Sequence, residues 1–155
     1  MSFRITGLPL EPFRPLFGLS DEALAARGVI RRIAEAKPGF PCRITLEDAE
    51  PGESLLLLNH ESHAAPTPYR SSYAIYVREG ASEAADYLDE IPPVMRRRPL
   101  AFRHFDAGGM LVGASLALNG DAREAIEAAF ENENVAYLHA HNAAHGCFAA
   151  RVDRA

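Results

Sequence analysis

The segment YLHAHNAAHGCFAARVDR, residues 137–154, concentrates side chains that can do chemistry. It contains three of the six histidines of the chain and one of its two cysteines. Imidazole and thiol groups transfer protons, act as nucleophiles and bind transition metals. A metal site, a catalytic site, an anion site and the polar side of an ordinary strand would all use these residue types. The elements that carry the segment decide which of these side chains meet.

A β-hairpin is the structure that this segment predicts. Its two strands flank the loop NAAHG, residues 142–146. Residues opposite each other in an antiparallel pair share a face, and side chains alternate between the faces with a period of two. The predicted cross-strand pairs are His141 with Cys147, His139 with Ala149, and Tyr137 with Arg151.

The two faces of this hairpin differ in chemistry. One face is apolar throughout, so we expect it to pack on the core against the helix that carries Ile126 and Phe130. That face comprises Ala136, Leu138, Ala140, Phe148, Ala150 and Val152. The other face comprises Tyr137, His139, His141, Cys147 and Arg151. An ordinary solvent-exposed face would instead show lysine, glutamate, threonine or serine.

Zinc or a similar ion is one ligand that the second face would fit. Alternate strand positions can point His139 and His141 at one ion, with Cys147 as a third ligand. His145 in the loop would add a fourth. The His-x-His spacing is a weak signature, and no HExxH or CxxC motif accompanies it. Hydrogen-bonded histidines on a sheet surface and a pocket for a small anion are the alternatives.

A second polar segment, NHESHAAPTPYRSS, follows an apolar strand over residues 59–72. Loops that leave a buried strand are a common place for binding groups. His60 and His63 could ligate a metal, and Arg70 with Tyr69 could hold a carboxylate or a phosphate. The alternative is a loop whose polar side chains satisfy its own backbone.

Catalytic residues stay unassigned at this level. His104 and Asp106 lie on one face of a predicted strand and would suit a base and its orienting carboxylate. The nucleophile would be Cys42, Cys147 or a serine, but no Gly-x-Ser-x-Gly turn is present. The sequence leaves open whether the protein is an enzyme.

Short strands and few helices position these groups. The predicted helices cover residues 20–28, capped by Ser20 and ended by Gly28, then 81–91, then 121–133, capped by Asp121. The predicted strands cover residues 3–6, 41–49, 54–61, 73–79, 135–141 and 146–152, with two more around a turn at 106–109. Residues 29–36 fit a strand or a helix.

These elements predict a single α+β domain over residues 1–155, in which residues 1–19 form an irregular N-terminal wrap. The expected architecture is a mostly antiparallel sheet of six to eight strands with two or three helices.

Composition is that of an ordinary globular protein and argues against several partners. Of the 155 residues, 48% are hydrophobic and 24% are charged, and the net charge is −5. That charge argues against nucleic acid and anionic membrane surfaces, which reward a positive face. The first residues lack the pattern of a signal peptide, and no apolar run is long enough to span a membrane. We therefore expect a bacterial-type cytoplasmic protein.

Three pieces of the chain together resemble a known family. They are PGFPCRITLEDAEPGESLLLL, PYRSSYAIYVRE and HNAAHGCFAARVD. In combination they are similar to the short bacterial proteins of the family called domain of unknown function 1203, and the resemblance extends over nearly the whole chain. It implies a compact bacterial protein of one domain. It implies no activity, cofactor or catalytic residue.

Three functions follow as hypotheses. The first is a pocket for a small anionic ligand, with or without enzymatic activity, lined by His139, His141, Cys147 and Arg151 and completed by His60, His63, Tyr69 and Arg70. The second is a zinc-like metal site on His139, His141 and Cys147. The third is a non-catalytic interaction domain or homodimer that uses the polar sheet face as its contact surface.

Overall fold

The computed structural model describes all 155 residues and contains two antiparallel sheets. The six-stranded sheet has the order β5 (Asp86–Leu88), β1 (Phe3–Thr6), β9 (Phe148–Arg154), β8 (Tyr137–Asn142), β6 (Leu100–Phe105) and β7 (Leu111–Ala117). The three-stranded sheet has the order β2 (Ile30–Ile33), β3 (Ser54–His63) and β4 (Ser71–Arg78). The helices are α1 (Asp21–Ala25), α2 (Pro93–Arg96) and α3 (Ala122–Phe130), with a short 3-10 helix at Arg14–Leu16. The predicted α+β class is therefore confirmed, with nine strands.

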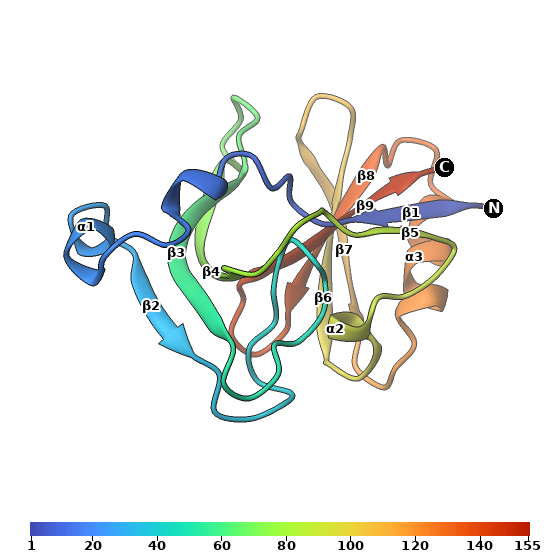
Figure 1. Ribbon diagram of the computed structural model, residues 1–155. Coiled ribbons are helices and arrows are strands. Elements are labelled where there is room, and N and C mark those ends of the chain that lie inside the picture. Colours follow the sequence, from blue (N-terminus) through green and yellow to red (C-terminus); the bar gives the residue numbers. More distant parts are fainter.

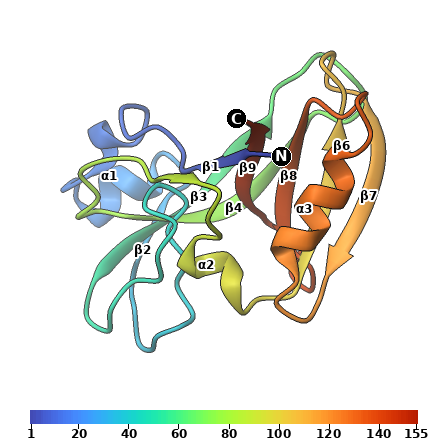
Figure 2. The ribbon, with the colours of Figure 1, turned by 90° about the vertical axis from the view of Figure 1, so that its right-hand side faces the viewer.

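The elements form three layers. In Figure 1 the three-stranded sheet lies on one side of the six-stranded sheet and α3 lies on the other. Figure 2 shows α3 in front of the six-stranded sheet, on the face turned away from β2, β3 and β4. Both termini lie at the same end of the molecule, because β1 and β9 are paired neighbours (Figure 1). No helix combines the length and the apolar character that crossing a lipid bilayer requires.

Two hydrophobic cores stabilise these layers. The larger one has 18 buried residues and joins the six-stranded sheet to α3 through side chains such as Ile126, Phe130 and Leu138. The predicted packing of the apolar hairpin face against this helix is thus confirmed for Leu138, Ala140, Ala150 and Val152, but not for Phe148. The second core has 11 buried residues and lies on the three-stranded sheet, where Leu24 of α1 meets Leu56 of β3.

Local sequence signals explain several elements. Ser20 caps α1 by accepting a hydrogen bond of 3.1 Å from the backbone N–H of Ala23, and Gly28 has the left-handed φ of 70° that was expected. Asp106 accepts hydrogen bonds from the N–H groups of Gly108 and Met110, which closes the turn between β6 and β7. Residues 29–36, which fit a strand or a helix, contain the strand β2.

The predicted strand at residues 41–49 is wrong. Cys42, Ile44 and Leu46 are buried as the alternation indicated, but the segment is a tight loop with only isolated bridges. Its N–H groups bond within the loop, from Leu46 to Cys42 and from Cys42 to Glu47, and Leu46 has a left-handed φ of 55°. The loop supplies Ile44 to the smaller core and Leu46 to the larger one. The alternation therefore reflects burial in two cores.

The predicted helix at residues 81–91 is also wrong. Its alanines favour a helix, but the chain forms β5, and Tyr87 pairs with Ile5 of β1. This pairing satisfies backbone groups that β1 would otherwise expose at the edge of the sheet. Pro93, the second of the two prolines after this segment, is the first residue of α2, a position that suits proline.

Two finer predictions need correction. Asp121 precedes α3 as expected, but its side chain makes no capping bond and accepts from the N–H of Asn119. The final hairpin forms in a different register, with His139 opposite Arg151 and His141 opposite Phe148. A β-bulge between Ala140 and His141 adds a residue to β9. The bulge turns Phe148 from the predicted apolar face to the histidine face.

Candidate functional site

The histidine face of the β8–β9 hairpin lies between the two sheets. His139 and His141 are each 2% exposed, and His63 of β3 is 3% exposed. Their rings approach one another, with centroids 5.3 Å apart for His63 and His139 and 6.5 Å apart for His139 and His141. Phe148 packs its ring edge-on against His139. We call the group formed by His63, His139, His141 and Tyr137 the histidine cluster.

One hydrogen bond in this cluster joins the two sheets. The Nε2 atom of His63 lies 2.8 Å from the hydroxyl of Tyr137, and its Nδ1 atom lies 3.1 Å from the carbonyl oxygen of Tyr69. A carbonyl only accepts, so Nδ1 carries a proton and donates it to Tyr69, and in the neutral tautomer that this defines Nε2 accepts from the Tyr137 hydroxyl. His63 is thereby fixed in one tautomer, stacked on Phe105 at a centroid distance of 4.1 Å.

Burial keeps two imidazoles of the cluster, those of His139 and His141, uncharged near neutral pH. It lowers the pKa of His139 to about 3, with further lowering by His63, His141 and two arginines. Burial also lowers the pKa of His141 to about 4, against a hydrogen bond to the carbonyl of Gly146 that raises it. Both imidazoles are therefore neutral at pH 7 and have no direct access to solvent.

The side chains proposed for a metal do not converge. No group of three or more His, Cys, Asp or Glu side chains is arranged to hold a metal ion. The sulfur of Cys147 accepts hydrogen bonds from Arg43 and Asn142, which are not metal ligands of this kind. The geometry thus gives the zinc-like hypothesis no ligand set.

A cavity of about 620 Å³ lies beside the cluster, where the loop after β8 approaches the three-stranded sheet. Its volume is in the range usual for small-molecule sites. The wall has an apolar part and a polar part with arginine, histidine and thiol groups. The lining residues are Gly39, Pro41, Arg43, Leu57, Tyr73, Ala74, Tyr76, Arg98, Pro99, Asn142, Ala143, Ala144, His145 and Cys147.

Arg43 is the unusual group in this wall, because it is buried without an acidic partner. The residue is 4% exposed and makes no ion pair. Its Nε donates to the carbonyl of Phe148 at 2.9 Å, and one Nη donates to the carbonyl of Pro41 at 2.7 Å. The other Nη donates to the sulfur of Cys147 at 3.2 Å. Burial lowers the pKa of Arg43, yet a guanidinium stays protonated in proteins.

Arg98, the second arginine of the wall, differs because its charge is neutralised. It donates to both carboxylate oxygens of Asp48, at 2.6 and 3.0 Å. Burial raises the pKa of Asp48, but the hydrogen bonds from Arg98 and from the backbone N–H of Gly39, together with nearby positive charges, hold that pKa below its ordinary value. Asp48 therefore stays ionised at pH 7 and leaves Arg43 as the one uncompensated charge of the wall.

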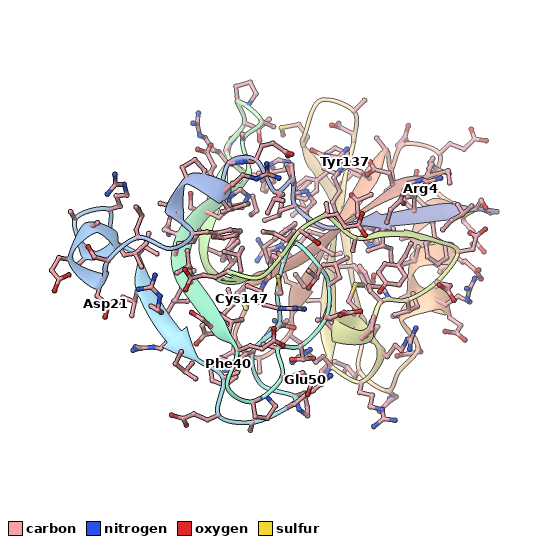
Figure 3. The ribbon with its side chains drawn as sticks, viewed as in Figure 1. Arg4, Asp21, Phe40, Glu50, Tyr137 and Cys147 are labelled. Carbon is pink, nitrogen blue, oxygen red and sulfur yellow. The ribbon has the colours of Figure 1, made fainter.

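Cys147 places a thiol in the same cavity. Its sulfur also accepts from the Nδ2 of Asn142 at 3.3 Å, and the residue is partly exposed. The oxygen of the same amide, Oδ1 of Asn142, is buried and has no hydrogen-bond partner. Figure 3 shows Cys147 in the middle of the molecule, between the two sheets.

The remaining predicted residues lie away from the cavity. Arg70 is exposed and pairs with Glu61, and Tyr69 is exposed in the same loop. Arg151 pairs with Asp153 and lies 3.9 Å from the centroid of the Tyr137 ring. Cys147 lines the cavity; His63, His139 and His141 form the buried cluster; His60, Tyr69, Arg70 and Arg151 lie outside both.

His104 and Asp106 do not act as a pair. The Nε2 of His104 lies 2.9 Å from the hydroxyl of Ser115, whereas Asp106 bonds to the backbone of its own turn. Burial lowers the pKa of His104. Neither residue lines the 620 Å³ cavity, and the two side chains bond to different partners, so Asp106 does not orient His104 as a base.

A family model described as Protein of unknown function (DUF1203) matches residues 39–154. The chain belongs to this family. The predicted resemblance is therefore confirmed, and the DUF1203 match begins at Gly39 and includes every residue that lines the cavity. The strand β1, the helix α1 and the strand β2 precede it. No curated protein and no solved structure is significantly similar to the chain.

Sequence reasoning missed the most informative residue of the DUF1203 chain. Arg43 alternates with Cys42 and Ile44, so the predicted strand placed it on a solvent face. Only the tight loop turns its guanidinium inward, toward the start of β9 at Phe148, 105 residues later in the chain. Tyr73 and Tyr76 have the character of ordinary strand residues in the sequence. They line the cavity only because the two sheets pack against each other.

Proposed function

We propose that the protein binds a small organic anion in the cavity, with the charged group of the ligand on Arg43. The observation that carries this proposal is a buried guanidinium on the cavity wall with no carboxylate beside it. Burying an unpaired charge is costly, so buried charges in proteins are normally paired. A ligand carboxylate or phosphate would supply the missing partner.

The donor inventory of Arg43 supports this assignment. A guanidinium has five N–H donors, and Nε and each Nη of Arg43 use one apiece. Two donors, one on each Nη, remain for a ligand. A pair of donors on adjacent nitrogens matches the two oxygens of a carboxylate or phosphate.

The apolar wall favours an organic anion over an inorganic one. Leu57, Tyr73 and Tyr76 present hydrocarbon and aromatic surface to the same space. Inorganic phosphate would leave this surface in water, whereas an aliphatic or aromatic acid would cover it. Burial of apolar area then adds to the charge interaction.

Calorimetry and thermal unfolding with a series of short aliphatic and aromatic carboxylates test the proposal. At a ligand concentration of a hundred times Kd, binding adds about 2.7 kcal/mol of stability, which raises the Tm of a protein of this size by roughly 5 to 10 °C. We expect this shift with the wild type and with Arg70→Gln, a control that removes an exposed arginine. Arg43→Gln should abolish it.

A second variant tests the cavity independently, in case Arg43→Gln fails to fold. Leu57→Trp fills the cavity from the three-stranded sheet and leaves the guanidinium in place, so it should also abolish the shift. A carboxylate that binds Arg43→Gln and Leu57→Trp as tightly as the wild type would refute the cavity as its site. A wild type that binds no member of the series would refute the proposal itself.

A further inference from the structure

Cys147 combines three features that the proposed binding function does not use. Its thiol is free, it faces a cavity, and two N–H donors point at its sulfur. One donor belongs to the Arg43 guanidinium and the other to the amide of Asn142. Donors of this kind, one of them positively charged, stabilise negative charge on sulfur, and the thiolate is the reactive form of cysteine.

The other cysteine provides a contrast within the same chain. Cys42 is 0% exposed, and its sulfur accepts from the backbone N–H groups of Ile44, Thr45 and Arg78. These bonds hold the Cys42 sulfur within the closed loop, and its burial keeps reagents from reaching it. A disulfide formed at Cys147 with a small molecule would thus have no accessible second thiol in the chain to displace it.

We propose that Cys147 is a modification site that forms mixed disulfides with small disulfides bearing carboxylate groups. The Cys147 thiolate attacks one sulfur of the reagent, and a new S–S bond forms as the original one breaks. The displaced thiolate leaves with the electron pair and takes a proton from water. No other oxidant is needed, because the reagent disulfide is reduced to one free thiol as Cys147 is oxidised.

Arg43 gives the site its preference for an anionic reagent, and this part of the inference rests on the proposed anion-binding function. A carboxylate held by the free donors of the guanidinium would lie close to the sulfur that the guanidinium already contacts. The unpartnered Oδ1 of Asn142 is a second sign of a missing ligand, since a buried acceptor is normally satisfied. A reagent with an N–H group would satisfy it.

The test compares two reagents of similar length on the folded protein. Dithiodipropionate carries a carboxylate at each end, and hydroxyethyl disulfide is neutral. Intact-mass spectrometry follows adduct formation with time, and peptide mapping locates the adduct. We expect one adduct per chain, on Cys147, and faster reaction with the anionic reagent. Cys147→Ser should form none, whereas Cys42→Ser should react like the wild type.

Arg43→Gln tests whether the guanidinium charge sets the reagent preference. The ratio of the rates with the two disulfides is measured on the same variant, so a general loss of reactivity is distinguished from a loss of preference. We expect its reaction with dithiodipropionate to be roughly three- to tenfold slower than that of the wild type, and its preference for the anionic reagent to disappear. Asn142→Ala should slow both reagents and keep the preference. An adduct on Cys42, an inert Cys147, or an unchanged preference in Arg43→Gln would each overturn the inference.

Reversible carboxylate binding by the wild type separates this inference from the proposed function. A wild type that binds carboxylates but forms no adduct at Cys147 would overturn the modification site and leave the proposed function standing. A wild type that binds no carboxylate and reacts equally with both disulfides would overturn the proposed function together with the reagent preference.

Discussion

Neutral imidazoles in the histidine cluster connect the stability of the protein to pH. His139 and His141 have pKa values of about 3 and about 4 in the folded state, against 6.5 for the exposed side chain. The unfolded chain therefore binds more protons than the folded chain between pH 6.5 and pH 3. Stability that is present above pH 6.5 is lost as the pH falls through this window.

We expect the free energy of unfolding to fall by about 1.4 kcal/mol per pH unit for each of the two histidines below pH 6. Urea denaturation at pH 7, 6 and 5 measures this slope. His139→Gln should reduce the slope by about one histidine, whereas His145→Gln, at an exposed position of the same hairpin, should leave it unchanged. An equal slope in wild type and His139→Gln would contradict the assignment.

The period of two predicted that Tyr137, His139 and His141 share one face, but neither the place of Phe148 on that face nor what the face meets. The alternation of Tyr137 and His139 with Leu138 is a local property of a strand, and the structure keeps it. The burial of the histidines depends on His63 and Phe105, which reach them from β3 and β6. Such contacts between distant segments leave no trace in a local pattern.

The loop at residues 41–49 is the element on which the cavity most depends. It packs against the N-terminal segment so closely that a Cβ atom at Gly7 would lie 1.8 Å from the carbonyl oxygen of Ile44. Leu8 donates its N–H to the carbonyl of Arg43 next to this contact. Only glycine fits at this position.

Gly7→Ala should therefore displace the loop and destabilise the protein by about 1 to 3 kcal/mol or more, the usual cost of overpacking. It should also weaken carboxylate binding, since Arg43 moves with the loop. Chemical denaturation and calorimetry give the two quantities. Gly80→Ala is the matched control, because a Cβ atom there meets nothing within 4 Å, and it should change neither. If Gly7→Ala retained full stability, the close packing would be refuted.

Periodicity worked for elements whose partners lie nearby and failed where distant segments decide. The hairpins β6–β7 and β8–β9 and the helix α3 follow from turn residues and amphipathic spacing. Apolar and polar residues alternate in the loop at 41–49 as they would in a strand. The apolar ones are nevertheless buried in two different cores, Cys42 and Ile44 in the smaller one and Leu46 in the larger one. The segment that contains β5 has helix-forming alanines, but it pairs with β1, which lies some 80 residues earlier.

At the scale of the whole molecule, the hydrogen bond between His63 and Tyr137 tests how strongly the two sheets are coupled. Tyr137→Phe removes the donor and leaves the Nε2 of a buried imidazole without a partner. We expect a loss of about 1 to 3 kcal/mol of stability by chemical denaturation. Tyr69→Phe, at an exposed side chain whose carbonyl already serves His63, is the control and should have little effect.

The cavity is shared by both sheets, and this has a kinetic consequence. Leu57 and Tyr76 come from the three-stranded sheet. Cys147 follows β8 of the six-stranded sheet, and Arg43 comes from the loop at residues 41–49. We expect an acid that contacts both sheets to lose these contacts before the transition state for unfolding, and therefore to slow unfolding and leave the folding rate nearly unchanged. Stopped-flow unfolding with and without saturating carboxylate measures this rate. The resistance of the bound protein to proteolysis and heat would then depend on how long the two sheets stay together.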